Sequence, residues 1–180
     1  MPVDVQTATD SPLPEPERIR RWAEATLAEV SALWERPLAA NDPSAGAVSR
    51  LRSAAAGRSH EGRLGAAELC VRVVDEEESR RLNRDYRHKD APTNVLSFPA
   101  GIDLPDALIL GDVVVCAPVV QREADQQQKP YEHHFAHMVV HGVLHLLGYD
   151  HQTDAEASVM EKMEIGILDH FQIGDPYGEG

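Results

Sequence analysis

The sequence predicts an α+β protein with a small mixed sheet of about four strands packed with about five helices. Segments rich in β-branched residues are interspersed with longer segments whose apolar residues recur at helical spacing. The two kinds of segment are mixed without strict alternation, which favours the α+β class. A chain of 180 residues is long enough for one sizeable core, so we expect a single domain over residues 1–180.

The first predicted elements are a strand, a helix and an insertion. Residues 3–8 alternate weakly and predict a strand, which the proline-rich stretch after them ends. Apolar side chains recur at helical spacing from Glu17 to about Arg36, which predicts an amphipathic helix that ends before Pro37. Residues 38–66 are rich in Ala, Ser, Gly and Arg and keep no period, so we expect an exposed insertion of low order there.

Three further strands are expected in the middle of the chain. Residues 68–74 and 93–98 have strand-like composition, and so do residues 108–116, which are interrupted at Gly111. Asp75 directly follows the first of these strands and precedes a Glu-rich segment, so it is well placed as the N-cap of a helix.

The C-terminal part of the chain predicts three helices. Pro130 suits the start of the middle helix, and Gly148 suits the position just after its end. The last helix has apolar residues at helical spacing and an acidic outer face. We expect these helices over residues 118–128, 130–147 and 154–171.

The charge of the chain limits its partners. It carries 17 basic and 30 acidic residues, a net charge of −13, whereas a general polyanion binder is expected to be basic. Any contact with nucleic acid must therefore be local. One dense basic patch lies between residues 80 and 90. Its members are Arg80, Arg81, Arg84, Arg87 and Lys89.

The sequence also predicts a cytoplasmic protein without a membrane partner. No stretch approaches the roughly 18 consecutive apolar residues needed to span a bilayer, and residues 1–10 lack a signal pattern. In a reducing compartment, Cys70 and Cys116 are expected to be small buried hydrophobic residues and not a disulfide.

The most informative segment contains three histidines. His141 and His145 are four residues apart on the predicted helix, so both imidazoles lie on one face and can share a metal ion. Gly148 lets the chain leave the helix and turn back, which can bring His151 to the same ion. Three histidines plus water make the open tetrahedral site of catalytic zinc. The alternative is that these histidines are surface or capping residues, but unpaired imidazoles are costly on a largely buried helix.

Other histidines continue the same stripe. A competing triad of His137, His141 and His145 is poorer, because its outer members lie about 12 Å apart along the helix axis, too far for one ion. We therefore expect His137 to support the site or pack in the core. The remaining histidines of this region, His133, His134 and His170, are expected in solvent.

The spacing of the pair resembles the zinc-peptidase motif His-Glu-x-x-His, whose Glu is the general base. Gly142 occupies the Glu position here. A peptidase would lack its base unless Asp150 or another acid replaced it, so this interpretation is disfavoured.

Arg87 belongs to the basic patch and is a candidate phosphate ligand. A guanidinium offers several fixed donors to phosphate oxygens and stays charged at all physiological pH values. From the residues alone, a solvated helix end stabilised by the helix dipole is the favoured interpretation.

Three segments carry a resemblance to a known family. Residues 141–151 (HGVLHLLGYDH), 83–99 (NRDYRHKDAPTNVLSFP) and 110–116 (LGDVVVC) resemble the hallmark segments of the YbeY family, bacterial endoribonucleases of ribosomal RNA maturation. The resemblance covers about residues 67–172 and leaves out the insertion at 38–66. It implies a zinc-dependent, peptidase-like α+β fold with one Zn²⁺ per chain held by the motif histidines, and a part for Arg87 in RNA cleavage. The ligands would be His141, His145 and His151.

The resemblance also implies a function. We expect a zinc-dependent endoribonuclease specific for single strands, which acts in 3′-end maturation of the small-subunit (16S) ribosomal RNA and in ribosome quality control. Its partners would be single-stranded rRNA and the small ribosomal subunit with its proteins. Asp112 and Asp150 could orient an imidazole or a water, but we favour a turn-closing role for Asp112 and a loop cap for Asp150. The alternatives are a non-catalytic, metal-containing ribosome assembly factor and, less favoured, a zinc peptidase.

Overall fold

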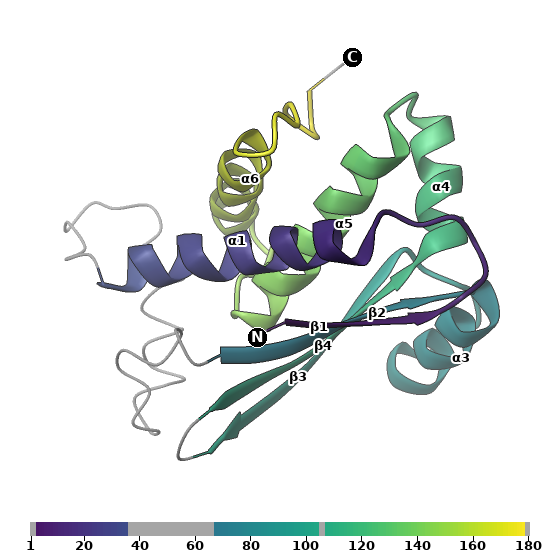
Figure 1. Ribbon diagram of the computed structural model, residues 1–180, viewed down its shortest axis with the longest axis horizontal. Helices are drawn as coiled ribbons and strands as arrows, with labels where there is room; N and C mark the ends of the chain where they lie inside the picture. The colour runs from purple at the N-terminus through teal and green to yellow at the C-terminus, as the bar shows by residue number, and fades with distance from the viewer. Residues whose placement is uncertain (1–2, 36–66, 105–106, 179–180) are drawn as a thin grey trace.

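The predicted α+β class is confirmed. The computed structural model describes residues 3–35, 67–104 and 107–178, which form one four-stranded mixed sheet and five helices (Figure 1). The predicted insertion at 38–66 lies outside the described residues. The strands are β1 (Val3–Ala8), β2 (Ala67–Val74), β3 (Val95–Asp103) and β4 (Leu108–Cys116). The helices are α1 (Pro16–Glu35), α3 (Glu76–Arg87), α4 (Ala117–Gln126), α5 (Tyr131–Leu146) and α6 (Asp154–Asp169).

The strands lie in the order β1-β2-β4-β3. β1 and β2 pair in parallel, β2 and β4 also pair in parallel, and β3 pairs antiparallel with β4. β3 is therefore an edge strand that runs opposite to the other three. Residues 95–100 of this strand line the groove of the candidate site.

β4 contains a bulge at Gly111, where the sequence predicted an interruption. The register with β2 passes from Glu68 opposite Ile109 to Leu69 opposite Gly111. Gly111 has a φ of +131°, and a Cβ atom there would lie 2.1 Å from the carbonyl oxygen of Phe98. The bulge changes which side chains of β4 face the main core, from the even-numbered Leu108 and Leu110 to odd-numbered residues further along.

The bulge also corrects the prediction for Asp112. That residue does not close a turn. It lies within β4, opposite Cys70 on one side and Phe98 on the other, and its side chain is exposed. Cys70 is a half-buried free thiol, and Cys116 is a buried one.

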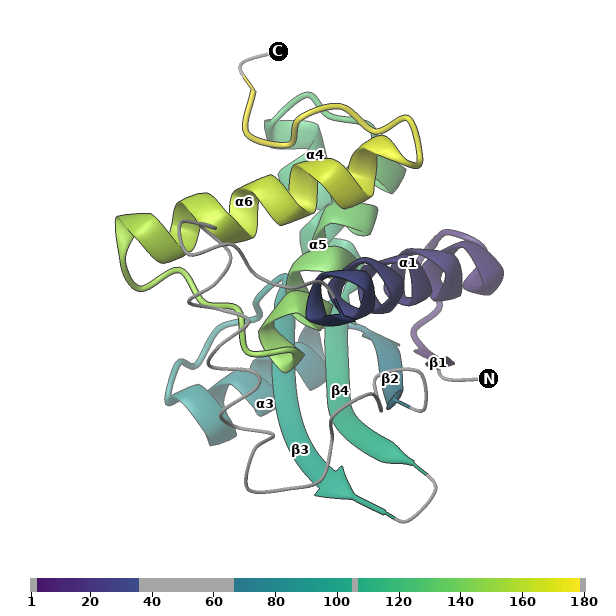
Figure 2. The same ribbon diagram turned by 90° about the vertical axis from the view of Figure 1, so that its left-hand side faces the viewer.

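Helices cover the two faces of the sheet unequally. α1 and α5 pack on one face, with α6 lying against these two helices, and α3 lies on the other face (Figures 1 and 2). The main core fills the first face and includes the fully buried Trp22, Phe135 and Leu144. The second face has a smaller cluster around Leu96 and Val114, against which Leu82 of α3 packs. α3 covers only part of this face, so a groove is left beside it.

α5 approaches the sheet closely at Gly142. A Cβ atom at this position would lie 2.4 Å from Cγ1 of Val113 and 3.1 Å from Cγ2 of Val95. The hydroxyl of Ser97, on β3, donates a hydrogen bond of 2.9 Å to the carbonyl oxygen of Gly142. The missing side chain thus allows α5 to lie against β3 and β4, which holds its histidine-bearing face at the edge of the sheet.

Among the described helices, none combines the length and the apolar composition needed to cross a bilayer.

Candidate metal centre

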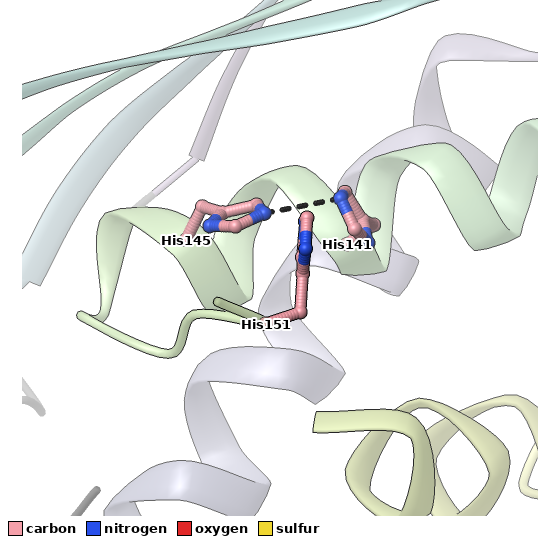
Figure 3. Close-up of side chains that lie close together, drawn as sticks. All are labelled: His141, His145 and His151. Atoms are coloured by element: carbon pink, nitrogen blue, oxygen red, sulfur yellow. Dashed lines mark hydrogen bonds between the residues drawn. The ribbon is translucent and has the colours of Figure 1, made fainter. Parts of the chain in front are cut away.

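Three histidines converge where α5 ends (Figure 3). His141 and His145 lie one turn apart on α5, with 3.1 Å between their Nε2 atoms, and His151 comes from the loop after the helix. The His151 ring centroid is 5.5 Å from that of His141 and 5.1 Å from that of His145. One ring nitrogen from each residue lies within 4.8 Å of the other two. The spacing in the sequence therefore predicted the residues that the structure brings together.

The turn that returns His151 to the helix depends on Gly148. The α5 helix ends with Tyr149 N–H bonded to the carbonyl of Leu144 and Gly148 N–H bonded to the carbonyl of His145, both at 3.0 Å. This is the Schellman pattern, and the left-handed φ of +85° at Gly148 completes it. Asp150 then accepts hydrogen bonds from the backbone N–H of His151 and the side chain of Gln152, so it caps the loop as predicted.

The donor set suits a divalent transition metal. Burial and the neighbouring imidazoles of His141 and His151 lower the pKa of His145 to about 4, so its ring is neutral at physiological pH. A metal ligand must be the neutral imidazole. Three imidazole nitrogens within reach of one point match the ligand count of an open zinc site. The residues present therefore fit the ion that the sequence implied.

A buried glutamate that the sequence analysis missed supports the centre. Glu164 of α6 has no exposed surface, and its Oε1 lies 2.8 Å from Nδ1 of His141. Its Oε2 lies 3.3 Å from Nε2 of His137 and also accepts a hydrogen bond from the hydroxyl of Tyr177. Burial acts to raise the pKa of Glu164, but the hydrogen bonds from His137 and His141 outweigh it and hold this pKa well below its usual range.

Glu164 fixes the orientation of His141. A carboxylate at Nδ1 requires the proton on that nitrogen, which leaves the Nε2 lone pair directed at His145 and His151. Carboxylates hydrogen-bonded to metal-ligating histidines in this way set the tautomer and raise the ligand's basicity. No spacing rule in the sequence could have found this residue, because it comes from a separate helix.

A second group of possible ligands shares His141 with the first. His137, His141 and Glu164 also bring one ligand atom each within 4.8 Å of one another. Their polar atoms already pair directly within this buried cluster. The three-histidine group, by contrast, opens into a groove. His137 thus supports the site, in agreement with the expectation from the sequence.

One prediction for the remaining histidines was wrong. His134 is buried and not in solvent, because its Nε2 donates a hydrogen bond of 2.8 Å to Glu123 of α4. Asn94 donates to the same carboxylate, at 3.1 Å to Oε2. His170 is exposed as expected, and His133 is half-buried.

Arg87 lines the same groove as the three histidines. The groove has a volume of about 1310 Å³ and runs from the histidines around β3 to the sheet face beside α3. Its wall includes Tyr86, Phe98, Asp112 and Asp150. Small-molecule pockets measure roughly 300–1,000 Å³, so this groove has room for an extended ligand.

Three of the four arginines of the basic patch form ion pairs. Arg80 forms two hydrogen bonds with Asp90, and Arg84 contacts Asp85 at 3.2 Å. Arg81 lies 3.9 Å from Glu78. Within the described residues, no carboxylate lies within ion-pairing distance of Arg87, whose side chain is exposed. Arg87 is therefore an exposed cation in the last turn of α3, and its donors face the groove without a carboxylate partner among the described residues.

The loop after α3 is tied back to the helix, which fixes where Arg87 lies. The Asn83 side chain donates a hydrogen bond of 2.7 Å to the carbonyl oxygen of Ala91. The Ser79 hydroxyl donates one of 2.8 Å to the carbonyl oxygen of Thr93. His88 ends the helix in the left-handed conformation, with a φ of +59°. Arg87 therefore projects from the last turn of a helix that its own loop anchors.

The position of Gly142 argues against a peptidase of the His-Glu-x-x-His type. This residue faces Val113 and Val95 of the sheet and not the groove, so a glutamate there would have no room. Glu164 cannot replace the missing glutamate as a general base. Its carboxylate contacts Nδ1 of His141, whereas the three histidines converge at Nε2 on the other side of that ring.

The fold and the three converging imidazoles define a candidate metal-dependent hydrolase of the α+β class. Comparison with known proteins makes this specific. The sequence model of the family described as "Endoribonuclease YbeY" matches residues 47–172, and the chain belongs to this family.

Similar proteins agree with that assignment. The endoribonuclease YbeY of Pseudomonas putida KT2440 is 42% identical over 98% of this chain and 93% of its own length. That of Halorhodospira halophila is 60% identical over 62% of this chain and 75% of its own length. The solution structure of TM1509 from Thermotoga maritima covers 98% of this chain and 99% of its own at 19% identity, with a TM-score of 0.51. This last likeness supports the fold alone.

Proposed function

We propose that this protein is a zinc-dependent endoribonuclease that cleaves single-stranded ribosomal RNA during 3′-end maturation and quality control of the small ribosomal subunit. His141, His145 and His151 would hold the ion, and Arg87 would act on the scissile phosphate. The single observation that carries the proposal is that three converging imidazoles and an arginine without a carboxylate partner among the described residues line one groove. Membership in the YbeY family supports the endoribonuclease class.

Zinc is the ion that the donor set favours. Three neutral imidazoles suit a borderline-soft ion better than the oxygen-preferring Mg²⁺ or Ca²⁺. When bound, zinc supplies Lewis-acid polarisation of a phosphoryl oxygen and makes water acidic enough to react near neutral pH.

Arg87 would stabilise the negative charge that grows on the phosphoryl oxygens as the phosphodiester bond breaks. Its guanidinium can donate two parallel hydrogen bonds to two of these oxygens. Because no described carboxylate competes for it, Arg87 keeps these donors available.

The groove supports a polymeric substrate. Its volume exceeds that of ordinary small-molecule pockets, and it extends on both sides of β3. The small ribosomal subunit and its proteins are part of the proposal, as is a cytoplasmic location, where such a substrate would be met.

Cleavage of paired and unpaired RNA tests the proposal. One labelled RNA is incubated alone and annealed to its complement, with zinc-loaded, chelator-treated and zinc-restored protein. We expect internal cleavage of the single strand only, lost with the chelator and recovered with zinc. Equal cleavage after complete metal removal, or no cleavage of either form, would contradict the proposal.

A further inference from the structure

We propose that Tyr86 and Phe98 form a stacking platform for one unpaired nucleobase of the substrate RNA, at the α3 end of the groove. This inference rests on the proposed function and adds a subsite to it. Tyr86 is the most exposed large hydrophobic residue among those described, with 66% of its surface accessible. The exposed ring offers an apolar π-face on which a base can stack.

Phe98 supports one side of the Tyr86 ring. The two ring centroids lie 4.9 Å apart and the planes meet at 69°, an edge-to-face contact. Aromatic pairs favour this arrangement, which leaves faces of the rings free. Phe98 itself belongs to β3 and packs on the smaller core cluster. An exposed ring with such support is organised before a ligand arrives.

The platform is continuous with the candidate catalytic centre. Tyr86 and Phe98 line the same groove as the three histidines. Arg87 directly follows Tyr86 in the last turn of α3. A base stacked on Tyr86 would therefore hold the neighbouring phosphate near a guanidinium.

The charge distribution explains why a stacking subsite is needed. The net charge of −13 opposes the long-range attraction of RNA. Most arginines of the basic patch are also neutralised by ion pairs, namely Arg80, Arg81 and Arg84. Stacking does not depend on charge, and every base offers a π-face to it, so it supplies sequence-tolerant affinity where electrostatics are weak.

The platform would also select single strands. In a duplex, both faces of each base are covered by the neighbouring pairs, whereas an unpaired base can splay out and stack on an aromatic side chain. The Tyr86 ring would thus exclude paired RNA without any contact that reads the sequence.

The test combines a protein variant with a missing base. Binding of an eight-nucleotide, cleavage-resistant 2′-O-methyl RNA to the zinc-loaded protein is measured for the parent, Tyr86→Ala and Tyr86→Phe. The same RNA is then used with an abasic nucleotide at each position in turn. Arg84→Ala is the matched control, because Arg84 lies on the same helix, outside the groove lining and paired with Asp85. Melting curves check that each variant is folded.

We expect Tyr86→Ala to weaken binding by about 5- to 100-fold, and Tyr86→Phe and Arg84→Ala to stay near the parent. At one position, the abasic RNA should bind the parent more weakly but bind Tyr86→Ala as well as the intact RNA does, since both changes remove one interaction. The stacking proposal is refuted if the parent and Tyr86→Ala bind RNA equally well, or if every abasic position weakens binding of both proteins alike. The proposed function would then still stand. If the parent neither binds nor cuts RNA, both are overturned.

Discussion

At the scale of single residues, the site depends on groups that the ion itself would not touch. Glu164 contributes a fully buried carboxylate whose oxygens contact His141 and His137. A buried carboxylate without such partners would be strongly destabilising. Tyr177 adds a further donor from the C-terminal segment. The orientation of one ligand histidine therefore depends on α6 and on the chain that follows it.

Glu164→Gln should weaken metal binding. The amide keeps the size of the side chain but loses the charge that holds the Nδ1 proton of His141. We expect the zinc dissociation constant to rise by about 10- to 100-fold, measured by competition with a chromophoric chelator. Glu161→Gln, at an exposed position of the same helix, is the control and should match the parent. A variant that melts earlier yet binds zinc normally would make Glu164 a packing residue only.

Arg87→Ala should separate catalysis from binding. We expect normal folding and zinc content and a modest loss of RNA affinity, but a cleavage rate at saturating RNA reduced by about 100-fold or more, the effect of losing one well-placed donor. Arg87→Lys should be intermediate, because it keeps the charge and loses the planar fork. Arg84→Ala, which alters the ion-paired part of the patch, should cleave as fast as the parent. A change in affinity alone for Arg87→Ala would refute its catalytic role.

At the scale of elements, α5 combines two functions on two faces. One face carries the ligand histidines, and the other packs on β3 and β4 through Gly142. Glycine in a helix interior normally costs about 1 kcal/mol relative to alanine. Here the close approach to the sheet offsets that cost.

Two glycine substitutions test this packing. Gly142→Ala places a methyl group 2.4 Å from Val113 Cγ1 and should destabilise the protein by about 1–3 kcal/mol, as overpacking does. Gly166→Ala, in α6, meets no atom within 4 Å and should stabilise it by up to about 1 kcal/mol. Denaturant unfolding measures both. The packing account fails if the two substitutions act in the same direction.

Glu123 of α4 is hydrogen-bonded to His134 of α5 and to Asn94, which directly precedes β3. This junction should be sensitive to acid. Burial acts to raise the pKa of Glu123, but hydrogen bonds from His134 and Asn94, with the nearby charge of Arg122, lower it below its ordinary 4.5. A carboxyl whose folded pKa is lowered stabilises the protein above its unfolded pKa. This stabilisation is lost as the pH falls through the folded value.

Glu123→Gln should therefore flatten the acid side of the stability profile. As the pH falls below 4.5, the parent should lose stability more steeply than the variant, by at most about 1.4 kcal/mol per pH unit. Urea unfolding at a series of pH values measures the two slopes. Parallel profiles for parent and variant would show that the junction does not sense pH through Glu123.

The elements also show how far sequence reasoning reached. Strands and helices follow from periods of 2 and 3.6 residues, and the three-histidine group follows from one four-residue spacing plus a glycine turn. All of these signals are local. Glu164 and the Glu123–His134 pair depend on which helices become neighbours, and no local period encodes that. Asp112 was misjudged because it follows the predicted interruption at Gly111, whereas the strand continues through a bulge and the Asp112 side chain lines the groove.

At the scale of the whole molecule, the fold brings two distant segments to one groove. The end of α3 supplies Tyr86 and Arg87 from one face of the sheet, and the end of α5 supplies the histidines from the other. The edge strand β3 lies between them, and both ends line the same groove. An acidic protein can thus present one local cationic group beside a candidate metal centre.

The central claim is that the three-histidine group holds the ion on which RNA cleavage depends. Zinc content and cleavage of single-stranded RNA, measured together for the parent, His141→Ala and His133→Ala, test it most directly. His133 lies on the same helix, outside the group. We expect about one zinc per chain and full cleavage for the parent and His133→Ala, and neither for His141→Ala. A His141→Ala protein that keeps its zinc, or that loses zinc and still cleaves at the parental rate, would contradict the account.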